Sequence, residues 1–214
     1  MRTLSLLTGL FLVANTALFA QADAKADGIL KSVSSNYRSY TAIKADFTVL
    51  TEDPKAKTSD TQTGTVSLKG SKYKLEIKGQ EVISDGKTVW TFVKDANEVQ
   101  ISEPNAKEDA ITPSNIFTMY EKGFDAKFVE EKTEGAKQMQ VIDIKPQDAK
   151  KNFFKIRLTF DKASKNIVRS EVFNKNGSHV TYSIRNFTAN APLTDSNFTF
   201  DKSKHPGVEV VDLR

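Results

Sequence analysis

The chain has 214 residues, of which 38% are hydrophobic, and a formal net charge of +4. Its 14 Phe, 5 Tyr and 1 Trp offer enough bulky apolar surface for a single folded domain, which excludes intrinsic disorder. The absence of cysteine excludes disulfides, thiolate metal sites, cysteine nucleophiles and an acylated N-terminal cysteine. Only two histidines, His179 and His205, are present, so a zinc site or a histidine-centred triad is not expected. Lysines are scattered among acids without a cluster of like charge, which argues against nucleic-acid binding.

The first twenty residues have the pattern of a secretory signal. Arg2 provides a short positive region, and an almost uncharged stretch rich in Leu, Ala and Phe follows it. Small residues then permit cleavage after Ala20 or after Ala22. The competing interpretation is a membrane anchor, but the run is short for a spanning helix and no basic cluster ends it. We therefore expect residues 1–20 to be a cleaved signal peptide and residues 21–214 to form one domain.

An amphipathic helix is predicted over residues 23–40, because apolar residues recur there at spacings of three and four. After it the hydrophobic period changes to two, which indicates strands with one apolar face. The predicted strands contain Phe47-Val49, Val66-Leu68, Tyr73-Leu75-Ile77, Trp90-Phe92, Val99-Ile101, Ile142-Ile144, Phe154 to Phe160, Val180-Tyr182-Ile184 and Phe198-Phe200.

Two dipeptides between these strands favour tight hairpins. Asp85-Gly86 and Asn176-Gly177 each lie between apolar runs and tolerate the positive φ angles of type I′ turns. About ten to eleven consecutive antiparallel strands predict one large curved sheet, and hence a mainly β fold with some helix.

Residues 103–123 interrupt this pattern. Thr112 can cap a helix that has Pro113 at its first position, and a helix over 112–122 is expected. It would carry the apolar side chains of Ile116, Phe117, Met119 and Tyr120. Such a helix can pack on the sheet as part of the core, or it can serve as a lid over a cavity. Likewise the concave face of the sheet can be filled by its own side chains or can enclose a ligand.

Several segments are similar to one known family. The run Val82-Ile83-Ser84-Asp85-Gly86-Lys87-Thr88-Val89-Trp90 resembles the V-S-D-G-K-T-L-W hairpin of the periplasmic outer-membrane lipoprotein carriers, the LolA family. The end of the chain also resembles the terminus of that family, with Phe198-Thr199-Phe200 followed by Pro206-Gly207-Val208-Glu209-Val210-Val211-Asp212. Ile144-Lys145-Pro146 and the strand after it are also similar, and the resemblance extends over the mature chain.

This resemblance implies an unclosed antiparallel β-barrel with a helical lid, located in the periplasm. It also implies a monomeric carrier, without cofactor or metal, that accepts acylated lipoproteins from an inner-membrane ABC transporter and passes them to an outer-membrane acceptor. Because each buried CH₂ contributes about 0.8 kcal/mol, acyl chains need such a shield in water. The expected walls of the acyl site are Phe47, Val49, Leu68, Tyr73, Leu75, Trp90 and Phe92, and the expected lid residues are Ile116, Phe117, Met119 and Tyr120.

The chain departs from the family at one position that bears on the lid. The family has an Arg-Pro pair, whose arginine holds the lid by hydrogen bonds, where this chain has Lys69 and Gly70. Lysine keeps the charge but lacks the planar fork of donors, so Lys69 is a candidate latch or an ordinary solvated lysine. Two other functions stay open at this stage: a general lipid carrier or lipid sensor on the same fold, and an enzyme. No G-x-S-x-G motif supports the enzyme.

Overall fold

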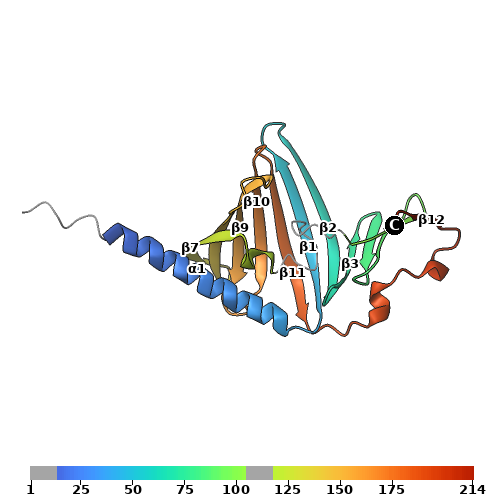
Figure 1. The fold of residues 1–214 in the computed structure, drawn as a ribbon, viewed down its shortest axis with the longest axis horizontal. Coiled ribbons are helices and arrows are strands. Elements are labelled where there is room, and N and C mark those ends of the chain that lie inside the picture. The colour runs from blue at the N-terminus through green and yellow to red at the C-terminus, as the bar shows by residue number, and fades with distance from the viewer. Residues whose placement is uncertain (1–13, 105–117) are drawn as a thin grey trace, which may run out of the picture.

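The computed structural model describes residues 14–104 and 118–214, with side chains from residue 23 onward except that of residue 119. In these ranges twelve strands form one sheet, and one long helix, α1 (Ala14–Ser39), runs diagonally along one side of it (Figure 1). The strands of the first half are β1 (Ile43–Asp53), β2 (Thr58–Lys69), β3 (Lys72–Ile77), β4 (Gln80–Ser84), β5 (Val89–Val93) and β6 (Glu98–Ser102). Those of the second half are β7 (Phe124–Glu134), β8 (Lys137–Pro146), β9 (Phe153–Asp161), β10 (Ile167–Asn174), β11 (His179–Ala189) and β12 (Glu209–Asp212). Three short 3₁₀ helices are η1 (Met119–Glu121), η2 (Asp195–Phe198) and η3 (Lys202–Lys204).

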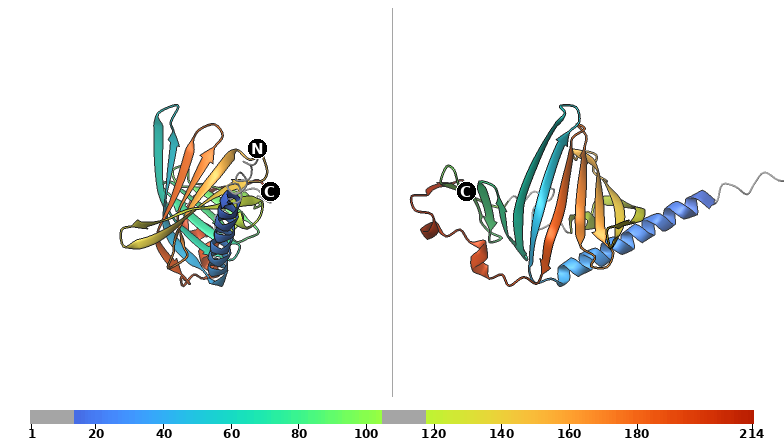
Figure 2. Two further views of the ribbon diagram at one scale, coloured as in Figure 1. Left: turned by 90° about the vertical axis from the view of Figure 1, so that its left-hand side faces the viewer. Right: turned by 180° about the vertical axis from the view of Figure 1, so that it is seen from behind.

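The strand order is β12-β6-β5-β4-β3-β2-β1-β11-β10-β9-β8-β7, so β12 and β7 are the two edges and the sheet does not close. All neighbouring strands are antiparallel except β12, which pairs in parallel with β6. Figure 2 shows the strong curvature of the sheet and α1 on its concave side. The predicted fold, an unclosed antiparallel half-barrel with a helical cover, is confirmed.

Both predicted hairpins form, but not through the expected type I′ turns, because Asp85 and Asn176 lack the positive φ that this turn type requires. Gly86 has φ of +92° and Gly177 has φ of +96°, a region that costs glycine little. The preceding residues complete the turns, because the Asp85 carboxylate accepts from the backbone N–H of Thr88 at 2.7 Å and the Asn176 amide oxygen accepts from that of Ser178 at 2.9 Å. The local sequence therefore determines these two reversals.

Three features differ from the sequence-based expectation. Phe198-Phe200 is not a strand, because Thr194 and Asn197 form a capping box that winds η2 instead. β7 is not evident from the sequence, since a bulge between Phe128 and Glu130 breaks its alternation after Phe128. A second bulge inserts Phe154 into the β9–β10 pairing, so this side chain leaves the inner face and is 49% exposed.

The predicted amphipathic helix is confirmed over its described length, and α1 also continues upstream as far as Ala14. Its buried stripe of Ala26, Leu30, Val33 and Tyr37 packs into the main hydrophobic core together with β8, β9 and β10. The Tyr37 hydroxyl accepts a hydrogen bond from the backbone N–H of Ile167 at 2.9 Å, and burial raises the pKa of this phenol. No helix in the described part of the chain is both long and apolar enough to cross a membrane. Cleavage of residues 1–20 stays a prediction.

Candidate functional site

The concave face of the sheet is assembled from residues that lie far apart in the sequence. Directly opposite residues of an antiparallel pair point to the same face, so the register identifies each face without ambiguity. Leu68 lies opposite Tyr73, and Val66 opposite Leu75. Phe47 lies opposite Gly64. Of the predicted wall, Leu68 belongs to the main core, and Phe47, Tyr73 and Leu75 pack against it. Val49, two residues after Phe47 on β1, shares its face and is half-buried.

The same register places two predicted wall residues on the other face. Trp90 pairs with Ile83, which pairs with Lys74, and Phe92 pairs with Glu81. Lys74 lies between the inward-pointing Tyr73 and Leu75 on β3, so its side chain points outward. Ile83 and Trp90 lie opposite it in successive strands and therefore point outward too. Phe92, two residues after Trp90, shares that outward face. The prediction that they share one wall with Leu75 is therefore wrong. Periodicity reveals the alternation in each strand but not its phase relative to the neighbouring strand.

Residues of the C-terminal segment cover this outward cluster. The Phe92 ring lies 5.5 Å from that of Phe200 and 4.3 Å from that of His205, measured between centroids. Val99 and Val208 complete the cluster, and Trp90 packs against it. His205 is consequently half-buried against aromatic rings. The chain thus covers its own second apolar patch.

Lys69 also binds this segment. Its amine lies 3.0 Å from Asp195 Oδ1 and 3.3 Å from the carbonyl oxygen of Leu193, and the Lys72 amine lies 2.9 Å from Asp195 Oδ2. Hydrogen bonds from Lys72 and Lys69 lower the pKa of the Asp195 carboxyl. In the described residues, therefore, Lys69 fastens the C-terminal segment. Most of the expected lid lies outside the described residues, so a latch role for Lys69 stays a prediction.

Two of the four predicted lid residues, Ile116 and Phe117, lie outside the described residues, as does the side chain of Met119. The fourth, Tyr120, lies in η1 and is 4% exposed within the main core. Its ring is 6.4 Å from that of Phe160 in an edge-to-face arrangement. η1 is joined to α1 by an ion pair between Arg38 and Glu121.

Burial changes along the concave face. Beneath α1 the inward residues of β8 and β9 are fully buried, with Ile142 and Phe160 at 0% exposure. Toward the hairpin that joins β1 and β2, away from α1, Phe47 and Leu75 are only half-buried. The same apolar face therefore passes from a filled core into a surface that retains accessible hydrocarbon.

Strand β11 adds three residues to this half-buried region that are not among the predicted wall residues. Tyr182 lies opposite Val49, and Ile184 lies opposite Phe47. Val180, two residues before Tyr182, packs against the main core with them. Burial raises the pKa of the Tyr182 phenol, as it does for Tyr73. Their alternation is visible in the sequence, but the pairing of β1 with β11 is not.

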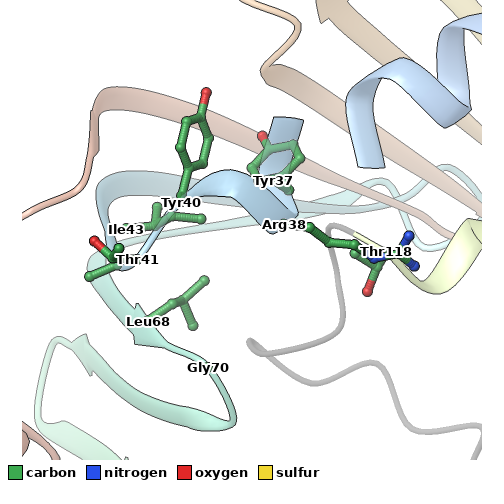
Figure 3. A pocket seen from close by; sticks show the side chains of 9 residues that line it. Tyr37, Arg38, Tyr40, Thr41, Ile43, Leu68, Gly70 and Thr118 are labelled. Atoms are coloured by element: carbon green, nitrogen blue, oxygen red, sulfur yellow. The ribbon is translucent and has the colours of Figure 1, made fainter. Parts of the chain in front are cut away.

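Two cavities open beside α1, and Arg38 lines both. The first, of about 240 Å³, lies between the last turn of α1, the start of β1 and the end of β2, where Tyr37, Leu68 and Thr118 line it (Figure 3). The second, of about 340 Å³, lies between α1, η1 and β7. Each volume is several times the roughly 30 Å³ that one water molecule occupies in the liquid.

The charges near α1 form pairs, not a catalytic cluster. Hydrogen bonds from Lys162 at 2.6 Å and Lys25 at 3.0 Å lower the pKa of the Glu131 carboxyl to about 2. Lys25 belongs to α1 and Glu131 to β7, so this pair also fixes the helix to the sheet edge. In residues 14–104 and 118–214, no three His, Asp or Glu side chains are arranged to hold a metal ion. The geometry is that of an apolar binding surface.

The sequence model of the family described as "Outer membrane lipoprotein carrier protein LolA" matches residues 38–201, more than half of the chain. The chain belongs to the LolA family. No curated protein is significantly similar to it in sequence.

Solved structures share the fold of this LolA-family chain at low sequence identity. An uncharacterized conserved protein from Thermus thermophilus has 16% identity and a TM-score of 0.60, with 88% of this chain and 99% of that chain covered. The lipoprotein LppX from Mycobacterium tuberculosis has 8% identity and a TM-score of 0.52, with 80% and 98% covered. A DUF1329 family protein from Desulfovibrio piger has 9% identity and a TM-score of 0.50, with 86% and 99% covered. At these identities the likeness concerns the fold alone.

Proposed function

We propose that this LolA-family chain is a periplasmic carrier that binds the acyl chains of lipoproteins released from the inner membrane and delivers them to the outer membrane. The observation that supports it best is the half-buried apolar region of the concave face, formed by Phe47, Tyr73, Leu75 and Tyr182. This region continues directly into the core beneath α1. An acyl chain on it would leave water without requiring the core to open.

The energetics suit reversible transport. Each methylene that leaves water contributes about 0.8 kcal/mol, so a chain of which about ten methylenes are covered gains about 8 kcal/mol, a micromolar affinity. An inner-membrane ABC transporter would load the carrier and an outer-membrane acceptor would unload it, so the carrier itself needs no catalytic group. We accordingly propose a binding protein and not an enzyme.

The test is native mass spectrometry of tagged mature protein, residues 21–214, recovered from the periplasm. The proposal expects copurified acylated lipoprotein that a detergent wash removes. A fluorescent triacylated lipopeptide should then bind the emptied protein, and the same peptide without acyl chains should not. Equal binding of both peptides would contradict the proposal, and copurified phospholipid or free fatty acid would favour a general lipid carrier instead.

A further inference from the structure

The larger cavity contains a polar feature that a purely hydrocarbon ligand would not use. Ser34 of α1 and Tyr120 of η1 line it, and they are 3% and 4% exposed. Within the described part of the chain, neither hydroxyl forms a hydrogen bond of normal geometry, and the nearest approach to one is the weak interaction of the two hydroxyls with each other. A buried hydroxyl left without a partner costs about 1–3 kcal/mol, so two at one cavity call for a ligand or another function.

The two hydroxyls are close neighbours. Burial raises the pKa of Tyr120 to about 12, and weak hydrogen bonding with the Ser34 hydroxyl opposes part of that rise. Each hydroxyl has one hydrogen to donate, so the pair can present two donors to a single acceptor oxygen.

The rim of the cavity does not favour a charged acceptor. Asp27 and Lys31 of α1 lie there, and Arg38 is paired with Glu121. Two positive and two negative groups cancel, so the rim gives no net attraction to a carboxylate or a phosphate.

The remaining walls are apolar and belong to the core. Leu30 is a core residue, and Phe124 and Ala126 of β7 pack against that core. A ligand held here by a polar group could therefore extend hydrocarbon along the same apolar surface.

From these features we propose that the cavity between α1, η1 and β7 binds the neutral ester carbonyl that joins an acyl chain to its glyceryl group. Ser34 and Tyr120 donate hydrogen bonds to this oxygen. The assignment rests on the proposed function and refines it: the concave face takes the hydrocarbon, and this cavity recognises the linkage.

A matched pair of ligands isolates the linkage. Dioctanoylglycerol carries two ester carbonyls, and dioctylglycerol diether has the same chain length and no carbonyl. One buried hydrogen bond is worth about 1 kcal/mol, so the protein should bind the diester about thirtyfold more tightly if both bonds form. Ser34→Ala and Tyr120→Phe should each reduce this preference about fivefold, and the double variant should abolish it. Ser35→Ala, at an exposed position of the same helix, is the control and should change nothing.

Thermal unfolding of the empty protein supplies a second readout, because a hydroxyl with a structural role and a hydroxyl that binds a ligand predict different changes in Tm. Because the two hydroxyls form no well-aligned hydrogen bond in the empty protein, neither variant should lower the Tm. A lowered Tm with an unchanged diester preference would mean that the hydroxyls are structural, and would overturn the assignment. Equal affinity of the natural chain for diester and diether would overturn it while leaving the carrier proposal intact. Failure to bind either ligand, or the acylated peptide, would overturn both.

Discussion

The division of the sheet into two apolar faces makes a prediction that a matched pair of substitutions can test. Phe92 and Leu75 were both expected in the acyl site, but Phe92 points outward under the C-terminal segment and Leu75 points into the concave face. Phe92→Ala should therefore reduce stability and leave acyl binding unchanged. Leu75→Ala should weaken acyl binding and reduce stability much less than Phe92→Ala does.

The magnitudes follow from burial. Phe92 is 5% exposed and contacts two other rings, so its truncation should cost about 3–5 kcal/mol. In a domain of this size that lowers the Tm by roughly 6–20 °C. Leu75→Ala removes three carbon atoms from a half-buried side chain. About half of their transfer free energy, some 1 kcal/mol, is gained only when a ligand covers them. Losing this contribution should raise the Kd for lipopeptide roughly five- to tenfold.

The assay combines thermal unfolding, titration with acylated lipopeptide and the fluorescence of Trp90, the single tryptophan of the chain. Trp90 packs against the Phe92 cluster, so Phe92→Ala should shift its emission toward that of exposed indole. Lipopeptide binding should leave the emission of the natural chain almost unchanged, because the ligand lies on the opposite face. A fivefold or larger loss of affinity in Phe92→Ala, or a large emission shift on binding, would refute the assignment of the faces.

Three further predictions concern stability and the C-terminal segment. Because the folded-state pKa of Glu131 lies at about 2, below its usual 4.5, its ionised form stabilises the fold above about pH 5 and this contribution is lost as the pH falls toward 2. Glu131→Gln should thus flatten the fall of Tm over that window, and an unchanged pH profile would contradict the role of the pair. Gly64→Ala should destabilise by about 1–3 kcal/mol in urea, because its Cβ would overlap the carbonyl oxygen of Glu76. Gly28→Ala, in open space on α1, should instead stabilise by about 0.5–1 kcal/mol. Lys69→Ala should speed hydrogen exchange in residues 193–200 without weakening lipopeptide binding, whereas weakened binding would support the latch role instead.

In the proposed function, the open part of the concave face would let one fold combine a stable core with a ligand that can be released. Packing at β8 and β9 is complete, so ligand release need not affect the global stability of the sheet. Arg38 lines both cavities, and its ion-pair partner Glu121 lines the larger one.

The sequence alone determined the elements whose information is local. The stripe of α1 follows from the spacing of its apolar residues, and the reversals at Gly86 and Gly177 follow from residues that tolerate positive φ. Alternation revealed which residues of one strand share a face. These features depend on neighbours within a few positions, where backbone sterics and side-chain spacing act directly.

Only the tertiary structure decided which face of each strand is turned inward. Trp90 and Phe92 have the same local pattern as Tyr73 and Leu75, and a strand with two apolar faces gives no signal of its phase. Bulges add to the difficulty, since the one at Phe154 reverses the orientation of a single side chain. The pairing of β1 with β11, which brings Tyr182 beside Val49, joins residues more than a hundred positions apart. The acyl surface therefore depends on register and long-range pairing, which are fixed by the burial of the whole sheet and not by any one segment.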